Sequence, residues 1–136
     1  MGLKKIFICS ILFSLPLFSL AGMKVIRLEI LESGHPVEDT KDDPNNYKVV
    51  CKGWNPTEKQ LIDFFAKAQI SDQGYGWLHE YYSPCIATGT VTFKDGSYGE
   101  WGIYDTGYGS VDFKDKTDKI IKQKYFLNLK SKWLED

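Results

Sequence analysis

The chain has 136 residues, of which 43% are hydrophobic and 26% are charged, and its 17 basic residues are balanced by 18 acidic ones. This balance gives no electrostatic reason to expect nucleic acid or an anionic membrane as a partner. The length suits one domain with one modest hydrophobic core, and it excludes two full domains.

The first 21 residues have the three parts of a secretory signal peptide. Lys4 and Lys5 form a short positive region, residues 6–20 carry no charge, and small residues stand at positions 19 and 21, where signal peptidase recognises them. The alternative is an uncleaved membrane anchor, but the uncharged stretch would span only about 22 Å of a roughly 30 Å bilayer core. We therefore expect export, with residues 1–21 as signal peptide, residues 22–136 as one domain, and no membrane anchor after cleavage.

Removal of the signal peptide leaves 15 basic and 18 acidic residues, a net charge of −3. Cys9 is removed with it, and Cys51 and Cys85 remain. Two thiols in an oxidising compartment are expected to form a disulfide. The alternative is a metal site that also uses His35 and His79, but these positions match no zinc-ligand spacing. The sequence thus predicts a disulfide, with no metal and no cofactor.

The mature chain begins with a predicted strand and a polar loop. Residues 25–30 alternate between apolar and charged side chains, which predicts a half-buried strand. Its apolar face consists of Ile26, Leu28 and Ile30. Residues 33–46 are rich in Asp, Asn, Gly and Pro and indicate a solvated loop. We expect residues 47–51 to form a short extended run.

An amphipathic helix is predicted over residues 56–69. Asn55 is a candidate N-cap, Pro56 suits the first helical position, and Glu58 follows Asn55 at the spacing of a capping box. Apolar residues then recur at helical spacing. They are Leu61, Phe64, Phe65 and Ala68. Residues 71–84 are expected to be irregular or weakly helical.

From Cys85 onward the hydrophobic period is two, which predicts antiparallel strands separated by turns. We expect strands over residues 85–93, 98–104, 108–113 and 124–129. One face of these strands is apolar and is predicted to pack on Phe64 and Phe65; it consists of Val91, Phe93, Trp101, Ile103, Val111 and Phe113. Trp133 is expected to close the core. The predicted class is α+β, an antiparallel β-meander of four to five strands packed on one amphipathic helix.

Four segments resemble a family of small exported proteins of Gram-negative bacteria. They are Cys51 to Gln60, the Phe64-Phe65 pair, Tyr81 to Cys85, and Gly89 to Tyr104. The resemblance covers roughly half of the mature chain. It implies pairing of Cys51 with Cys85, a periplasmic location and a fold like the one above. It implies no substrate and no catalytic residue.

The other face of the predicted strands is a candidate partner-binding surface. Its candidate residues are Tyr98, Glu100, Tyr104, Tyr108 and Asp112, which are interspersed with Thr88, Thr90, Thr92 and Ser110. Tyrosines mixed with hydroxyls and acids are enriched where proteins bind proteins or sugars. The alternative is that tyrosine and threonine simply suit exposed strands.

Three functions follow as hypotheses. We favour a periplasmic, non-enzymatic binding protein whose partner is another protein, such as an immunity protein or an inhibitor of a toxin or wall-degrading enzyme. A cell-wall-associated structural domain is the first alternative. The second is a small hydrolase in which His79, next to Glu80, acts as general base. A tyrosine is the other candidate partner of His79, since adjacent side chains such as His79 and Glu80 generally point apart. No motif places a nucleophile or a second histidine near His79.

Overall fold

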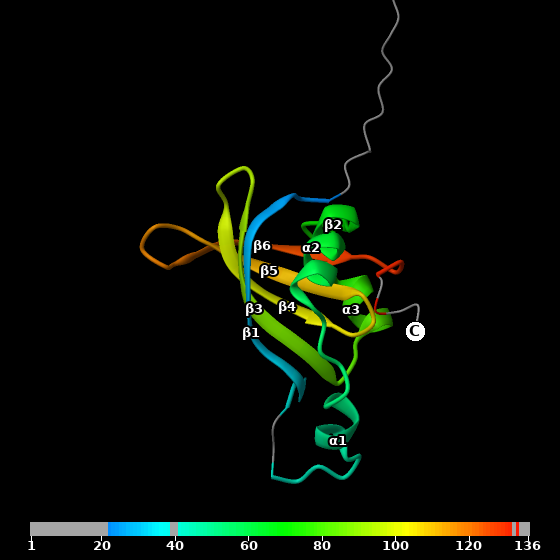
Figure 1. Ribbon diagram of the computed structural model, residues 1–136. Coiled ribbons are helices and arrows are strands. Elements are labelled where there is room, and N and C mark those ends of the chain that lie inside the picture. The colour runs from blue at the N-terminus through cyan, green and yellow to red at the C-terminus, as the bar shows by residue number, and fades with distance from the viewer. Residues whose placement is uncertain (1–21, 39–40, 132, 134–136) are drawn as a thin grey trace, which may run out of the picture.

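The computed structural model describes residues 22–38, 41–131 and 133 (Figure 1). Its centre is a six-stranded antiparallel sheet in the order β1-β3-β4-β5-β6-β2. The strands are β1 (Val25–Pro36), β2 (Gln69–Ser71), β3 (Cys85–Phe93), β4 (Tyr98–Tyr104), β5 (Tyr108–Lys114) and β6 (Ile120–Leu127). The helices are α1 (Tyr47–Cys51), α2 (Glu58–Lys67) and α3 (Tyr75–Tyr81).

The predicted α+β class is confirmed, with one strand more than expected. The additional strand is β2, which directly follows α2 and pairs with residues 125–127 at the end of β6. Between the two edges, β3, β4, β5 and β6 form the expected meander of hairpins. The long first strand β1 pairs with β3 and forms the other edge of the sheet.

The core lies between α2 and the inner face of the sheet, as the periodicity predicts. Phe64 and Phe65 are fully buried on α2. The ring of Phe65 packs edge-on against Phe93 at 5.4 Å and against Phe126 at 5.2 Å. Trp133 stacks on Phe64 at 5.5 Å, which confirms that it closes the core. All six apolar strand residues expected on this face are buried in the same cluster.

The helix α2 starts two residues later than predicted, because a different residue caps it. The Thr57 hydroxyl accepts a hydrogen bond from the Gln60 N–H (3.1 Å), and the Gln60 side chain accepts one from the Thr57 N–H (2.9 Å). This is a complete capping box, and it replaces the expected pair of Asn55 and Glu58. The Asn55 side chain instead accepts a hydrogen bond from Ser33, so it ties the loop before α2 to β1.

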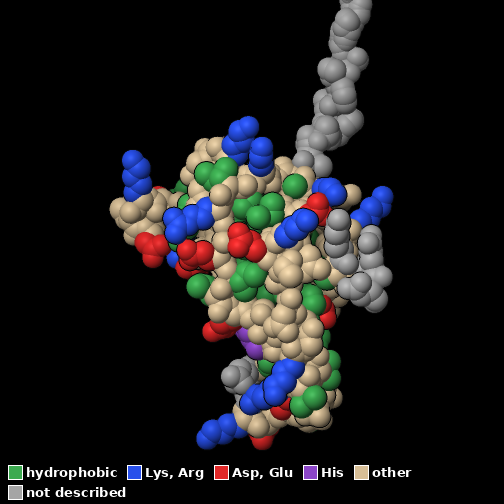
Figure 2. Space-filling model, viewed as in Figure 1, with side chains coloured by type: hydrophobic (Ala, Val, Ile, Leu, Met, Phe, Trp, Pro, Cys, Tyr) green, Lys and Arg blue, Asp and Glu red, His purple; other side chains and the backbone are tan. Residues whose placement is uncertain are grey.

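Residues 47–51 form the short helix α1 and not the expected extended run. The carboxylate of Asp43 accepts hydrogen bonds from the N–H groups of Tyr47 and Lys48, which fixes the first turn. At the other end, Cys51 is joined to Cys85. These two attachments override the strand preference of Val49 and Val50, whose side chains stay about 60% exposed. Figure 2 shows this segment as a narrow extension with hydrophobic and basic side chains at its surface.

Three further expectations near the sheet edges are wrong. Ile26 is 63% exposed and does not share the buried face of Leu28, because the pairing of β1 with β3 shifts register between Val25 and Arg27. The strand β1 also continues to Pro36, so the predicted loop 33–46 loses its first four residues to the sheet. At the far edge, β6 spans residues 120–127, four residues ahead of the predicted start.

Candidate functional site

The face of the sheet that points away from α2, here called the outer face, carries a row of polar side chains across five strands. Directly opposite partners on neighbouring strands point to the same side of a sheet. The pairing places these residues in one line: Glu29, Thr90, Glu100, Asp112 and Gln123. Local alternation supplies the outward direction of each side chain, and strand register brings the five together.

Next to this row lies a hollow, here called the trough, with a volume of about 420 Å³. Its floor is formed by small residues that lie opposite one another on β3, β4 and β5: Thr88, Gly102 and Ser110. Glu100 and Asp112 border it on one side, and the exposed Leu31 contributes an apolar surface. Gly102 keeps the floor low because it has no side chain to project outward.

A second hollow of about 230 Å³ continues the outer face toward the β3–β4 turn. Tyr98, 40% exposed, lies there with Thr92 and with Arg27 and Glu29, whose side chains pair at 3.2 Å. Together the two hollows give the outer face an extended polar surface with isolated apolar and aromatic groups.

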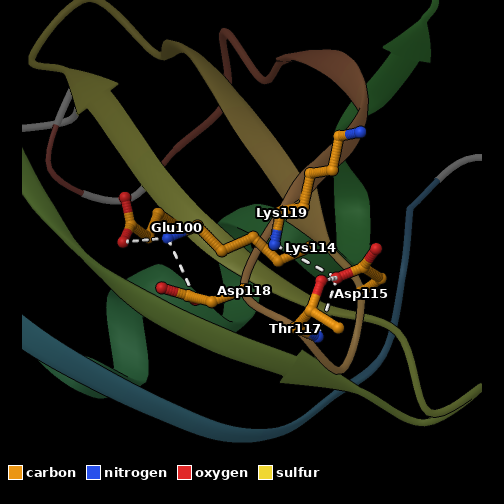
Figure 3. A network of polar contacts seen from close by, with 6 residues as sticks. All are labelled: Glu100, Lys114, Asp115, Thr117, Asp118 and Lys119. Carbon is orange, nitrogen blue, oxygen red and sulfur yellow. Dashed lines mark hydrogen bonds and ion pairs between the residues drawn. The ribbon is translucent and has the colours of Figure 1, made fainter.

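Glu100 and Asp112, the two acids that border the trough, differ in whether a cation pairs with them. Lys114 ion-pairs with Glu100 at 2.6 Å and with Asp118 at 3.2 Å (Figure 3). The hydrogen bond to Glu100 is the main cause that raises the pKa of Lys114. Asp112 accepts a hydrogen bond from the neutral amide of Gln123 (2.6 Å). Within the described residues no cation pairs with Asp112, so the trough keeps an uncompensated negative charge at that position.

The turn that supports Lys114 is itself ordered by hydrogen bonds. The carboxylate of Asp115 accepts bonds from the Thr117 hydroxyl and N–H and from the Lys119 N–H (Figure 3). The Thr117 side chain is the main cause that lowers the pKa of Asp115. The β5–β6 hairpin thus holds Asp118 within reach of Lys114.

At the other end of the outer face, three tyrosine rings form a stack. Tyr104 and Tyr108 are nearly parallel with centroids 5.7 Å apart, and Tyr108 and Tyr125 are parallel at 6.5 Å. The backbone at Gly74 lies against Tyr125, since a Cβ there would approach the ring to 2.4 Å. The helix α3 lies against β5, so residues 74–82 cover this end of the sheet.

The segment of residues 74–82 determines which of the predicted tyrosines are exposed to solvent. Tyr108 was expected to face solvent but is only 3% exposed, because the stack and the α3 segment enclose it. Burial, with smaller contributions from Tyr125 and Tyr104, raises its pKa to about 12. Tyr104 is half-buried, and burial raises its pKa too. The open part of the predicted site is therefore Tyr98, Glu100 and Asp112.

Sequence reasoning missed Gln123, Leu31 and the role of Gly102. Gln123 would have been assigned to the outer face if the last strand had been predicted to begin at residue 120, although only the strand register places it opposite Asp112. Leu31 lies beyond the predicted end of the first strand. Whether the surface above Gly102 is open depends on which residues lie opposite it on β3 and β5. The sequence around Gly102 does not identify those residues.

The remaining candidate groups lie away from the trough. His79 on α3 is exposed and has no ion pair within the described residues. His35 is half-buried, with its Nε2 3.2 Å from a carboxylate oxygen of Glu32. Cys51 and Cys85 form the disulfide. In the part of the chain that the structure describes, no three His, Cys, Asp or Glu side chains are grouped to hold a metal ion.

Two further findings concern the chain as a whole. Among the residues described, no helix is long and apolar enough to cross a bilayer. Comparison of the chain with protein-family models, with curated proteins and with solved structures gives no match, so the resemblance to exported proteins of Gram-negative bacteria stays a prediction.

Proposed function

We propose that the protein is a periplasmic, non-enzymatic binding protein that uses the open part of its outer face to bind another protein. Its partner is of the kind that an immunity protein or an inhibitor blocks, a toxin or a wall-degrading enzyme. The proposal rests on the trough over Gly102. No helix or loop of the described residues covers this trough, whereas residues 74–82 cover the tyrosine stack beside it.

The chemistry of the trough favours binding over catalysis. Its lining consists of two hydroxyl residues, two carboxylates, two glycines, the exposed Leu31 and the largely buried Trp101. Neither histidine lines it, and no described side chain pairs a nucleophile with a base there. A shallow surface with an apolar group and a polar rim is typical of protein–protein interfaces. Because the residues stand on paired strands, little side-chain and backbone freedom is lost when a partner binds.

Charge supports a partner with a basic contact surface. Asp112 has no cationic partner within the described residues, whereas Glu100 pairs with Lys114, which also pairs with Asp118. The expected mature chain also carries a net charge of −3. Complementary charge raises the association rate and selects among partners more than it adds affinity. We therefore place a basic group of the partner opposite Asp112, with the neighbouring hollow at Tyr98 extending the interface.

The test is capture of a partner from a periplasmic extract of the source organism by the immobilised mature protein. Asp112→Lys reverses the uncompensated charge, and Gly102→Thr fills the trough floor. At Gly102 a Cβ would meet the flexible tip of Ile86 at 3.3 Å and the Thr88 methyl group at 3.9 Å. Glu38→Lys is the matched control, because it makes the same charge change at an exposed position outside the trough.

We expect one protein to be captured by the wild type and by Glu38→Lys, with binding to Asp112→Lys and Gly102→Thr weakened about tenfold or more. Circular dichroism and urea unfolding establish that both variants stay folded. Capture that all three variants retain equally, or a complete lack of a captured protein, would refute the proposal.

A further inference from the structure

The C-terminal end of α2 receives hydrogen bonds from distant parts of the chain. The last carbonyl groups of any helix have no partner within the helix. Here the Phe64 carbonyl accepts a bond from the Asn128 side chain (3.3 Å), and the Phe65 carbonyl accepts one from the Met23 N–H (2.8 Å). The carbonyl of Ala68, the C-cap residue, accepts one from the Gly22 nitrogen (2.8 Å). The residues just before β1 therefore cap α2.

Only glycine fits at position 22. Its φ of +80° lies in the left-handed region, which other residues rarely adopt. More decisively, a Cβ on this residue would lie 1.9 Å from the Ala66 carbonyl oxygen and 2.4 Å from the Ala66 carbonyl carbon. Both atoms are backbone within or next to the last turn of α2, so they have little freedom to move away. The contact places the Gly22 nitrogen directly at the helix end.

The same residue follows the small residues at positions 19 and 21 that predict signal-peptide cleavage. We propose that signal peptidase hydrolyses the Ala21–Gly22 bond and that the new α-ammonium group of Gly22 docks on the Ala68 carbonyl at the C-terminus of α2. Hydrolysis breaks the bond between the Ala21 carbonyl carbon and the Gly22 nitrogen. Water supplies the oxygen that makes Ala21 a carboxylate, and the nitrogen, protonated at neutral pH, becomes an ammonium ion.

Cleavage changes the chemistry of this contact. Before cleavage the Gly22 nitrogen is a neutral amide with one hydrogen to donate. After cleavage it carries a positive charge and three hydrogens, and it lies at the negative end of the α2 macrodipole. Processing therefore strengthens the contact between the N-terminus and the helix that carries Phe64 and Phe65. The exported domain reaches its full stability only when the leader has been removed at this bond.

The test uses the full chain, exported with its own leader and purified from the periplasm. Intact mass spectrometry gives the mature N-terminus, which we expect to be Gly22. A variant with one serine inserted between Ala21 and Gly22 moves the ammonium group away from α2 by one residue. We expect its melting temperature to fall by about 1–5 °C, and this difference to shrink at high salt because charge–dipole interactions are screened.

Gly22→Ala supplies a second test through the clash with Ala66. We expect a larger fall in melting temperature than with the serine insertion, with the mature N-terminus still at position 22. A product that retains its leader, or that begins at another residue, overturns the proposal. It is equally overturned if the serine insertion leaves the melting temperature unchanged, or if the difference is the same at low and high salt.

Discussion

The disulfide between Cys51 and Cys85 allows the most quantitative prediction. It closes a loop whose ends are 34 residues apart, and both cysteines are buried. In the chain-entropy account, a loop of this length stabilises the folded state by about 4 kcal/mol at 25 °C because it restricts the unfolded chain. We therefore expect the double variant Cys51→Ala, Cys85→Ala to lose about that amount of unfolding free energy. Alanine is chosen over serine because a buried hydroxyl without a partner would add its own cost.

The loss should have a local component in α1. This helix has five residues, far below the length at which an isolated helix is stable in water. Among its attachments are the hydrogen bonds that its Tyr47 and Lys48 N–H groups donate to Asp43 and the disulfide at Cys51. Without the disulfide we expect residues 47–51 to exchange their amide hydrogens rapidly, while the amides of β4 and β5 stay protected until global unfolding.

Urea unfolding followed by tryptophan fluorescence measures the effect. With a slope of about 1.5–2 kcal/mol/M for a domain of this size, a loss of about 4 kcal/mol shifts the midpoint by roughly 2–3 M. The wild type in the presence of reductant serves as the control and should match the double variant. A loss below about 1 kcal/mol would refute the reasoning, because it would mean that closing this loop does not restrict the unfolded chain.

Three further predictions concern other contacts. Gly89→Ala would bring a Cβ to 1.9 Å from the Glu29 carbonyl oxygen, so we expect a loss of about 3 kcal/mol in urea unfolding; a loss below 1 kcal/mol would contradict the tight approach of β1 to β3. Thr57→Ala removes the capping box of α2 and should cost about 1 kcal/mol, whereas Thr57→Ser should cost little. Folding raises the pKa of Tyr108 to about 12, so its contribution to stability is complete below about pH 10 and is lost as the pH rises toward 12. Between pH 9 and 11 the urea midpoint should therefore fall less in Tyr108→Phe than in the wild type, and equal falls would argue against this assignment.

Local patterns were sufficient for the elements that carry the core. Helical spacing places Phe64 and Phe65 on the buried side of α2, and alternation places Trp101 and Val111 on the inner face of the sheet. Both predictions rest on the two backbone periods, 3.6 and 2, which relate a side chain's direction to its position in the sequence.

The candidate site was only partly predictable. Alternation identified Glu100 and Asp112 on the outer face, and the structure places them opposite each other on β4 and β5. It did not show that Lys114 compensates the first acid and Gln123 binds the second. Those contacts depend on the register between strands and on the turn that follows β5. Both are set by residues that lie outside any local window.

By itself, then, the sequence determined which residues point inward and outward along β3, β4 and β5, roughly where α2 lies, and that Cys51 and Cys85 pair. The tertiary structure decided which outward residues meet solvent. Tyr98 and Tyr108 have the same outward direction, yet one is 40% exposed and the other 3%, because residues 74–82 cover one end of the sheet and leave the other end open. Exposure is a property of neighbours brought together by folding, and periodicity along one strand holds no information about them.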